Sequence, residues 1–227
     1  MPVTPNILWI GALFGLLFVA AELLHRHTAL EAESTRKLTH IGTGLLAMLF
    51  PCYLGLVEVG ILCALFFIIL VLSKRRNLLG SINGITRKSF GSTLYPVAVF
   101  LAFWYDAALQ ASHFYYAAPI LMLALCDPFA AFAGRWWKRK SNIVSARKTI
   151  AGSGAFAALG LLIITALYYF FPQANTGLPL ILLLPAAIVG ALAERWSKNG
   201  WDNLTIPISV LLYFTTIGLI IFSHNFS

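Results

Sequence analysis

The sequence predicts an all-α fold, that of a polytopic membrane protein with about eight transmembrane helices. Hydrophobic residues make up 59% of the 227 residues. Charged residues make up only 11%, whereas an average soluble domain has about 25%. Apolar runs that approach the roughly 20 residues of a membrane-spanning helix recur along the whole chain. The predicted spans are residues 7–24, 41–54, 56–72, 92–106, 113–133, 154–171, 178–194 and 204–222.

The positions of lysine and arginine order these spans across the membrane. All sixteen lie in four short stretches, at residues 26–37, 74–88, 135–148 and 195–198. Both termini and the turns near Pro51, Asp106 and Pro172 carry none. Basic loops stay on the cytoplasmic side of a membrane. The first span therefore enters from outside, the next six form three hairpins with their turns outside, and the eighth returns the chain to the outer side.

One integral-membrane domain, residues 1–227, is the simplest organisation, because no repeat or long linker divides the chain. No basic segment precedes the first apolar run, so we expect a true span there and not a cleaved signal peptide. The basic residues are dispersed in short loops, which argues against nucleic acid as a partner. They balance anionic lipid headgroups, or a subset binds a polyphosphate. The sequence predicts no oligomeric state.

Two polar blocks lie in the first half of the chain. In residues 33–44, helical spacing places Arg36 and Lys37 on the same face as His40. Two cations beside an imidazole attract an anion and lower the pKa of the histidine, although a basic flank with an interfacial histidine has the same pattern. In residues 80–96, glycine and hydroxyl residues surround Arg87 and Lys88. Such a segment suits a phosphate cradle, or is a simple connecting loop.

The third polar block, residues 124–154, is the most informative. Asp127 lies seven residues before Gly134, so on a helix its carboxylate is roughly 10 Å inside the last turn. An acid at that depth is expensive and indicates a functional site, the alternative being neutralisation by a basic neighbour for packing. Pro128 can interrupt the helix beside it. Downstream, a basic pair precedes a glycine-serine segment, an arrangement that suits a polyphosphate at a helix N-terminus; the residues are Arg147, Lys148, Gly152 and Ser153.

The fourth block, residues 193–209, brings together Glu194, Asp202 and Asn203. Their side chains carry the oxygen ligands that Mg²⁺ prefers when it binds together with substrate phosphates. The alternative is a surface loop with incidental acids. Half of the eight acids lie on the predicted basic face, and Asp127 approaches that face from within the membrane.

In order and spacing, four motifs resemble the polyprenol kinase family, which includes dolichol kinase, phytol kinase and the CTP-dependent diacylglycerol kinase. They are RKLTHIGTG, GSTLYPVA, DPFAAFAGR followed by RKTIAGS, and GWDNLTIPI, and they cover about residues 33–215. The resemblance implies a multi-span enzyme that phosphorylates a membrane lipid alcohol with CTP and a divalent metal. The residues implicated at matching positions are Arg36, Lys37, His40, Asp127, Gly134, Arg135, Lys148, Gly152, Ser153, Asp202 and Asn203.

The chain departs from the family pattern at Cys126, where glycine is usual, and at Ala151, where glutamate is usual. Glu194 is the predicted replacement for the missing carboxylate. On this interpretation Asp127, Asp202 and Glu194 bind magnesium, and His40 or a carboxylate accepts the proton of the lipid hydroxyl. The cations that neutralise the charge developing on the transferred phosphoryl group are Arg36, Lys37, Arg147 and Lys148, whereas Lys138 and Lys140 contact lipid headgroups.

The predicted location is a cytoplasmic membrane, or a plastid or endoplasmic reticulum membrane, with the active face in the cytoplasm. Two other functions fit the sequence. One is a cytidylyltransferase that joins CTP to a phospholipid acid, suggested by a more distant similarity to phosphatidate cytidylyltransferase. The other is a transporter, with Asp127 and Glu58 as midplane binding groups.

Overall fold

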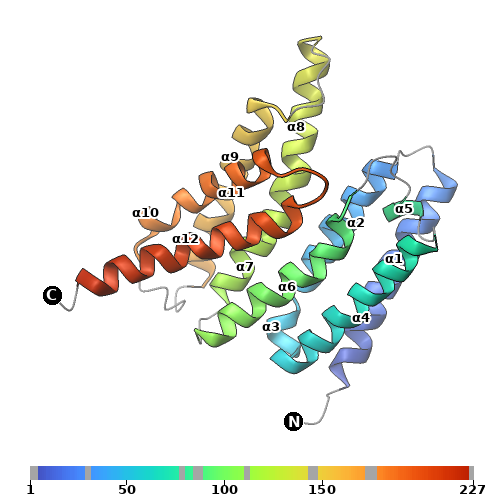
Figure 1. The fold of residues 1–227 in the computed structure, drawn as a ribbon, viewed down its shortest axis with the longest axis horizontal. Helices are drawn as coiled ribbons and strands as arrows, with labels where there is room; N and C mark the ends of the chain where they lie inside the picture. Colours follow the sequence, from blue (N-terminus) through green and yellow to red (C-terminus); the bar gives the residue numbers. More distant parts are fainter. Residues whose placement is uncertain are drawn as a thin grey trace.

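The computed structural model of the protein describes residues 5–28, 32–76, 80–83, 89–109, 113–142, 148–171 and 178–224. Within these ranges every regular element is a helix and none is a strand (Figure 1), which confirms the predicted all-α class. In chain order the helices are α1 (Asn6–His27), α2 (Ala32–Ala47), α3 (Phe50–Tyr53), α4 (Leu56–Arg75), α5 (Gly80–Asn83), α6 (Gly91–Ala108), α7 (Phe114–Leu121), η1 (Met122–Cys126), α8 (Asp127–Lys140), α9 (Ile150–Phe170), α10 (Leu180–Leu183), α11 (Pro185–Trp196) and α12 (Asp202–His224).

The chain is an integral membrane protein. Five described helical segments are long and apolar enough to cross a bilayer, namely Asn6–His27, Leu56–Arg75, Phe114–Lys140, Ile150–Phe170 and Asp202–Ile221. They correspond to five of the eight predicted spans.

The other three predicted spans fall on shorter or less apolar helices. Residues 41–54 are divided between α2 and α3, and residues 178–194 between α10 and α11. Pro185 occupies the first turn of α11, where its ring is tolerated but would interrupt a helix arriving from α10. The span at 92–106 is α6, which contains Asp106. The count of eight spans therefore remains a prediction.

One continuous rod made of α7, η1 and α8 runs through the bundle (Figure 1). The part of this rod formed by α7 and η1 lies in the core of the bundle. Its fully buried side chains include Phe114, Tyr116, Ile120, Met122 and Leu123. Segment η1 has the wider π-helical winding, a local irregularity that is frequent at functional sites. It packs against α2 on one side and against α9 and α12 on the other.

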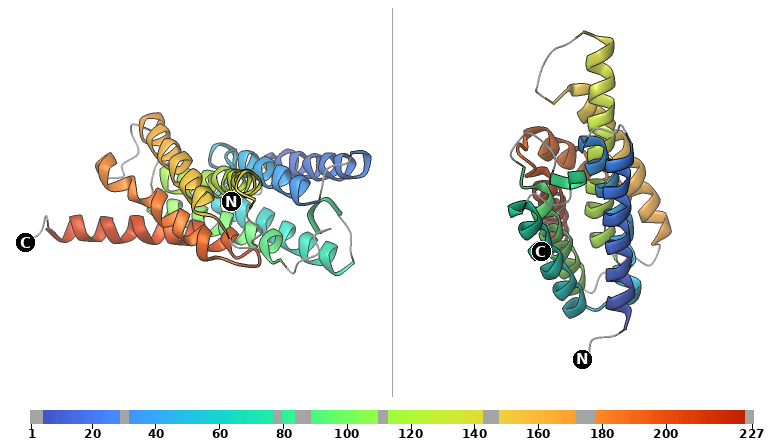
Figure 2. Two further views of the ribbon diagram at one scale, coloured as in Figure 1. Left: turned by 90° about the horizontal axis from the view of Figure 1, so that it is seen from above. Right: turned by 90° about the vertical axis from the view of Figure 1, so that its right-hand side faces the viewer.

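Helix α8 continues to Lys140, beyond the predicted end of its span at residue 133, and projects past the rest of the bundle (Figures 1 and 2). Its last turns are basic and amphipathic: Lys138, Arg139 and Lys140 follow one another. Asp127, at the start of α8, is consequently further from the end of its helix than predicted. The carboxylate lies inside the bundle, at 8% exposure.

Close backbone contacts fix the polar end of the bundle. A Cβ atom added at Gly152 of α9 would lie 2.8 Å from the carbonyl oxygen of Ala130 in α8, so only glycine lets these helices approach so closely. Gly200 has a φ of +83°, a conformation that favours glycine. This turn brings Asn203 to α6, where its amide donates a hydrogen bond of 2.7 Å to the carbonyl oxygen of Gly91.

Candidate active site

A polar pocket of about 770 Å³, its open mouth included, lies at the basic end of the bundle. Helices α2 and α8, the start of α9, the end of α11 and the turn before α12 form its walls. Three of the four predicted polar blocks therefore meet here, although they are far apart in sequence. The charged residues that line the pocket are Glu33, Arg36, Lys37, Asp127, Arg135, Lys138, Lys148, Glu194 and Asp202.

Lys148 joins two of the carboxylates. Its ammonium nitrogen lies 2.8 Å from Glu194 Oε1 and 3.1 Å from Asp202 Oδ2. Burial acts to lower the pKa of Lys148, but the charges of Asp202 and Glu194 outweigh burial and raise it above its ordinary value. Lys148 is therefore a permanent cation at neutral pH, held between an α11 side chain and an α12 side chain.

Asp127 is paired with Lys37 across the helix interface. Lys37 Nζ of α2 lies 3.2 Å from Asp127 Oδ2, and both side chains are mostly buried. The structure thus gives Asp127 a basic neighbour, which is compatible both with a functional carboxylate and with a packing ion pair. Arg36, one residue earlier, pairs with Glu33 through two hydrogen bonds of 2.8 and 3.2 Å.

His40 lies about one turn after Arg36 and Lys37 along α2, and it lines a second, apolar cavity. Its Nε2 is 3.0 Å from the carbonyl oxygen of Leu123 in η1. A carbonyl can only accept, so Nε2 carries the proton and Nδ1 has a free lone pair. Burial lowers the pKa of His40, Asp127 opposes this, and Lys37 and Arg36 lower it further. The lowered pKa follows the predicted direction, with burial as its main cause.

The start of α9 is organised by Thr149. Its hydroxyl oxygen accepts a hydrogen bond of 3.0 Å from the Gly152 N–H, which is N-cap geometry. Gly134 of α8 lies against the same hydroxyl, since an added Cβ would be 2.9 Å from it. The two glycines therefore serve the α8–α9 contact, and the Gly152 N–H is already occupied. Ser153 accepts a weak hydrogen bond from Arg195. The nucleotide-binding roles of Gly152 and Ser153 remain predictions.

Not every predicted residue reaches the polar pocket. Arg135 does line it, whereas Asn203 lines the apolar cavity and its amide is held by α6. Arg87, Lys88 and Arg147 lie outside the described residues.

The three predicted metal ligands share the pocket without forming a closed metal cage. Within the described ranges no group of three histidine, cysteine or acidic side chains is arranged to hold a metal ion. Mg²⁺ usually binds through one or two carboxylates together with substrate phosphates and water. Asp127, Asp202 and Glu194, all at the pocket wall, suit that open type of site.

Three residues that line the two cavities are not predicted as site residues by the sequence. Glu33 and Lys138 line the polar pocket, so the structure gives Lys138 a position at the site in addition to the membrane surface. Tyr95 stands with its ring against that of His40, the centroids 4.7 Å apart. The hydroxyl and glycine residues before Tyr95 had drawn attention to its block, but nothing in the sequence pairs it with His40.

Comparison with known proteins decides the family. The chain is 30% identical over 204 residues to the phytol kinase of Synechocystis sp. (strain ATCC 27184 / PCC 6803 / Kazusa), covering 87% of this chain and 85% of the relative. The chain belongs to the phytol kinase family. No protein-family model and no solved structure matches it.

Membership of the phytol kinase family confirms the resemblance drawn from the four motifs. The structure shows where this member of the phytol kinase family departs from the family motif, at Cys126 and Ala151. Cys126 is fully buried at the end of η1, next to Asp127. Ala151 lies in the first turn of α9, and Glu194 brings a carboxylate to the same pocket from α11.

Proposed function

We propose that this protein is a membrane kinase that transfers the γ-phosphoryl group of CTP to a lipid alcohol, with phytol and other isoprenoid alcohols as the first candidates. The relative that covers most of the chain is named a phytol kinase. The observation that carries the proposal is the polar pocket, in which Lys37 and Lys148 form ion pairs with three buried or half-buried carboxylates. A phosphoryl transfer site needs this combination of cations and metal-binding acids.

The ion pairs of the pocket can be exchanged for contacts with a nucleotide. A triphosphate is a stronger partner for Lys37 and Lys148 than a single carboxylate, because charge-assisted hydrogen bonds to phosphate are strong and numerous. With the lysines on phosphate, Asp127, Asp202 and Glu194 would be the residues that hold Mg²⁺, which would supply positive charge to the phosphate oxygens. Arg135 lines the same pocket, and Arg147, Arg87 and Lys88 are further candidates for phosphate contact.

The reaction needs positioning and charge neutralisation more than covalent chemistry. The alcohol oxygen bonds to the γ-phosphorus, the bond from that phosphorus to the bridging oxygen breaks, and CDP leaves. The hydroxyl proton passes to Nδ1 of His40, which is free because Nε2–H donates to Leu123. A carboxylate of the pocket is the alternative acceptor. The positive-inside rule supports a cytoplasmic face for this chemistry, because the basic ends of the helices lie beside it.

The test is a matrix of donors and acceptors with the purified protein. CTP and ATP labelled at the γ-phosphate are each offered with phytol, polyprenol, dolichol and diacylglycerol. The proposal expects labelled lipid monophosphate and a nucleoside diphosphate, with CTP preferred over ATP. Release of pyrophosphate with a cytidine-bearing lipid would identify a cytidylyltransferase instead. Uptake of solute into proteoliposomes without nucleotide, and no labelled lipid, would identify a transporter.

A further inference from the structure

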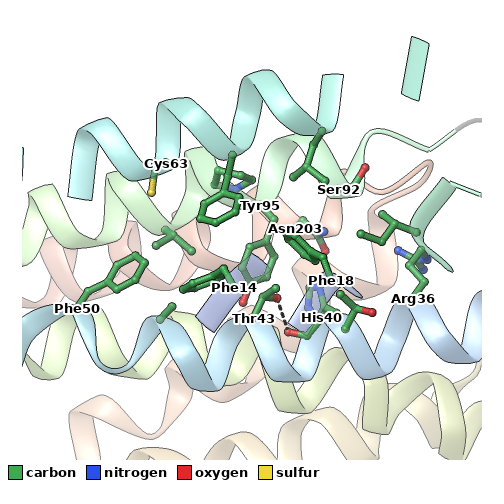
Figure 3. A pocket seen from close by; sticks show the side chains of 17 residues that line it. Phe14, Phe18, Arg36, His40, Thr43, Phe50, Cys63, Ser92, Tyr95 and Asn203 are labelled. Atoms are coloured by element: carbon green, nitrogen blue, oxygen red, sulfur yellow. Dashed lines mark hydrogen bonds between the residues drawn. The ribbon is translucent and has the colours of Figure 1, made fainter. Parts of the chain in front are cut away.

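Figure 3 shows an apolar cavity between α1, α2, α4 and α6. It adjoins the polar pocket, with which it shares the Arg36 side chain. It encloses about 670 Å³ including its mouth. Aromatic and aliphatic side chains form most of its wall, among them Phe14, Phe18, Phe50, Cys63, Phe66 and Leu70. A concave site with a mostly apolar wall and a few polar groups at one end is the form that small-molecule sites commonly take.

The cavity has a polar end and an apolar end. Arg36, His40 and Asn203 line one end, while Phe50 and Cys63 stand at the other (Figure 3). Along α2 the wall runs from Arg36 to Ala47, which at 1.5 Å per residue is roughly 16 Å. A ligand with one polar terminus and a long hydrocarbon chain fits this division.

The Tyr95 hydroxyl is a second, independent sign of a ligand. Tyr95 lines the cavity at 8% exposure. Its hydroxyl makes no hydrogen bond of normal geometry within the described part of the chain; the neighbouring Thr43 hydroxyl, which could accept from it, donates its own proton to the carbonyl oxygen of His40. Burying a hydroxyl without a partner is unfavourable, and a ligand hydroxyl would supply one. The ring of Tyr95 already rests against His40, the proposed proton acceptor.

Arg36 connects this cavity to the polar pocket, since its side chain lines both. A ligand whose polar terminus lies near His40 is therefore next to Arg36 and one helical turn from Lys37, the partner of Asp127. No other charged side chain of the described residues belongs to both linings.

We propose that this cavity binds the hydrocarbon tail of the lipid alcohol, with the hydroxyl at the His40–Tyr95 end and the chain running along α2 toward Phe50 and Cys63. The inference rests on the proposed kinase function and deepens it by assigning the acceptor site. It follows that the far wall limits the length of tail that the protein accepts, because a longer tail meets Phe50 and Cys63.

The first experiment shortens the cavity. Cys63→Trp fills the far end, and Leu65→Trp adds the same ring on the exposed side of the same helix, where Leu65 is 51% exposed. With geraniol and phytol as short and long alcohols, Cys63→Trp should raise the KM for phytol by about tenfold or more and change that for geraniol less than about threefold. Leu65→Trp should change neither. An unchanged ratio of the two KM values in folded Cys63→Trp would overturn the proposal.

The second experiment uses the unaltered protein, so it does not depend on the folding of a variant. A phytol analogue with a diazirine at the tail end is photolysed in vesicles that contain the protein, and the adducts are mapped by mass spectrometry. Adducts on Phe50, Cys63 or Phe66 that excess phytol suppresses support the assignment. Adducts only on lipid-facing side chains such as Leu65 contradict it. Suppression by added phospholipid but not by phytol assigns the cavity to a structural lipid and also contradicts it.

The two experiments separate the cavity from the kinase function. Adducts in the cavity that phytol suppresses, without phosphorylation of any alcohol, would support the binding site and overturn the kinase. Phosphorylation of phytol without such adducts, and with unchanged chain-length preference in Cys63→Trp, would support the kinase and overturn the cavity as its acceptor site.

Discussion

Lys148, which directly precedes the N-cap of α9, forms an ion pair of 2.8 Å with Glu194 near the end of α11. Asp202 of α12 shares the same ammonium group at 3.1 Å. One lysine just before α9 thus contacts both α11 and α12 at the wall of the polar pocket, and it is one of the cations for which we propose contact with a nucleotide phosphate.

Lys148→Ala is expected to weaken nucleotide use. Loss of a charge-assisted contact should raise the KM for CTP at least about tenfold, or roughly 1.4 kcal/mol. The matched control is Lys140→Ala, because Lys140 lies over the ring of Trp136, 5.2 Å from its centroid, and away from the pocket lining. Lys138 is unsuitable as a control, since it lines the pocket. Equal effects at Lys148 and Lys140 would move the nucleotide site elsewhere, first to Arg87 and Lys88.

Asp127→Asn should abolish turnover while the protein stays folded. The amide keeps the volume but loses the charge that Mg²⁺ requires. Asp106→Asn is the matched control, because Asp106 is also buried but lies near the opposite end of the bundle, paired with His113. We expect kcat to fall more than about tenfold for Asp127→Asn only, which is about 1.4 kcal/mol in barrier. A smaller fall would leave Asp127 with a structural role beside Lys37.

His40→Asn should lower kcat by about 10² or more, as the loss of a general base does, with little change in KM. The pKa of His40 is lowered from its ordinary value of 6.5, first by burial. The imidazole therefore stays neutral and able to accept a proton below pH 6.5, and kcat should fall only as the pH drops through the lowered value. The pH profile of the variant should lack this acid limb. The control His113→Asn, at the other end of the bundle, should keep the fall of kcat at low pH. If His40→Asn also kept this fall, His40 would be excluded as the base.

The basic end of the bundle should face the cytoplasm. Cys52 is exposed in α3, whereas Cys63 and Cys126 are buried, so Cys52 gives a native thiol on the predicted outer side. A membrane-impermeant maleimide applied to intact cells should label Cys52 and should not label Ser141→Cys at the end of α8 in a Cys52→Ser background. The reverse pattern would invert the topology and contradict a cytosolic nucleotide.

The charged half of the candidate site could be predicted from the sequence because charges inside an apolar chain are rare and costly. Asp127, Lys148, Asp202 and Glu194 stand out for that reason, and the structure places all four at one pocket. Which acid pairs with which lysine was not predictable, since the partners lie up to 90 residues apart.

The apolar half could not be predicted, because a cavity is a property of how helices pack. Phe14, Cys63 and Phe66 look like ordinary span residues in the sequence, and Cys63 is indistinguishable from a packing residue. The all-α class could be predicted from the length of the apolar runs. The breaks within the predicted spans were harder to predict. Pro185 divides one predicted span and the α2–α3 break divides another, and both depend on local backbone geometry that run length does not report.

The central claim is that the polar pocket transfers the terminal phosphoryl group of a nucleotide to a lipid alcohol. Its most direct test compares CTP labelled at the γ-phosphate with CTP labelled at the α-phosphate, each incubated with phytol, Mg²⁺ and the protein in vesicles. The account predicts label in the lipid from γ-labelled CTP alone, and none with Asp127→Asn. Label in the lipid from α-labelled CTP, or from neither donor with any alcohol of the panel, would contradict it.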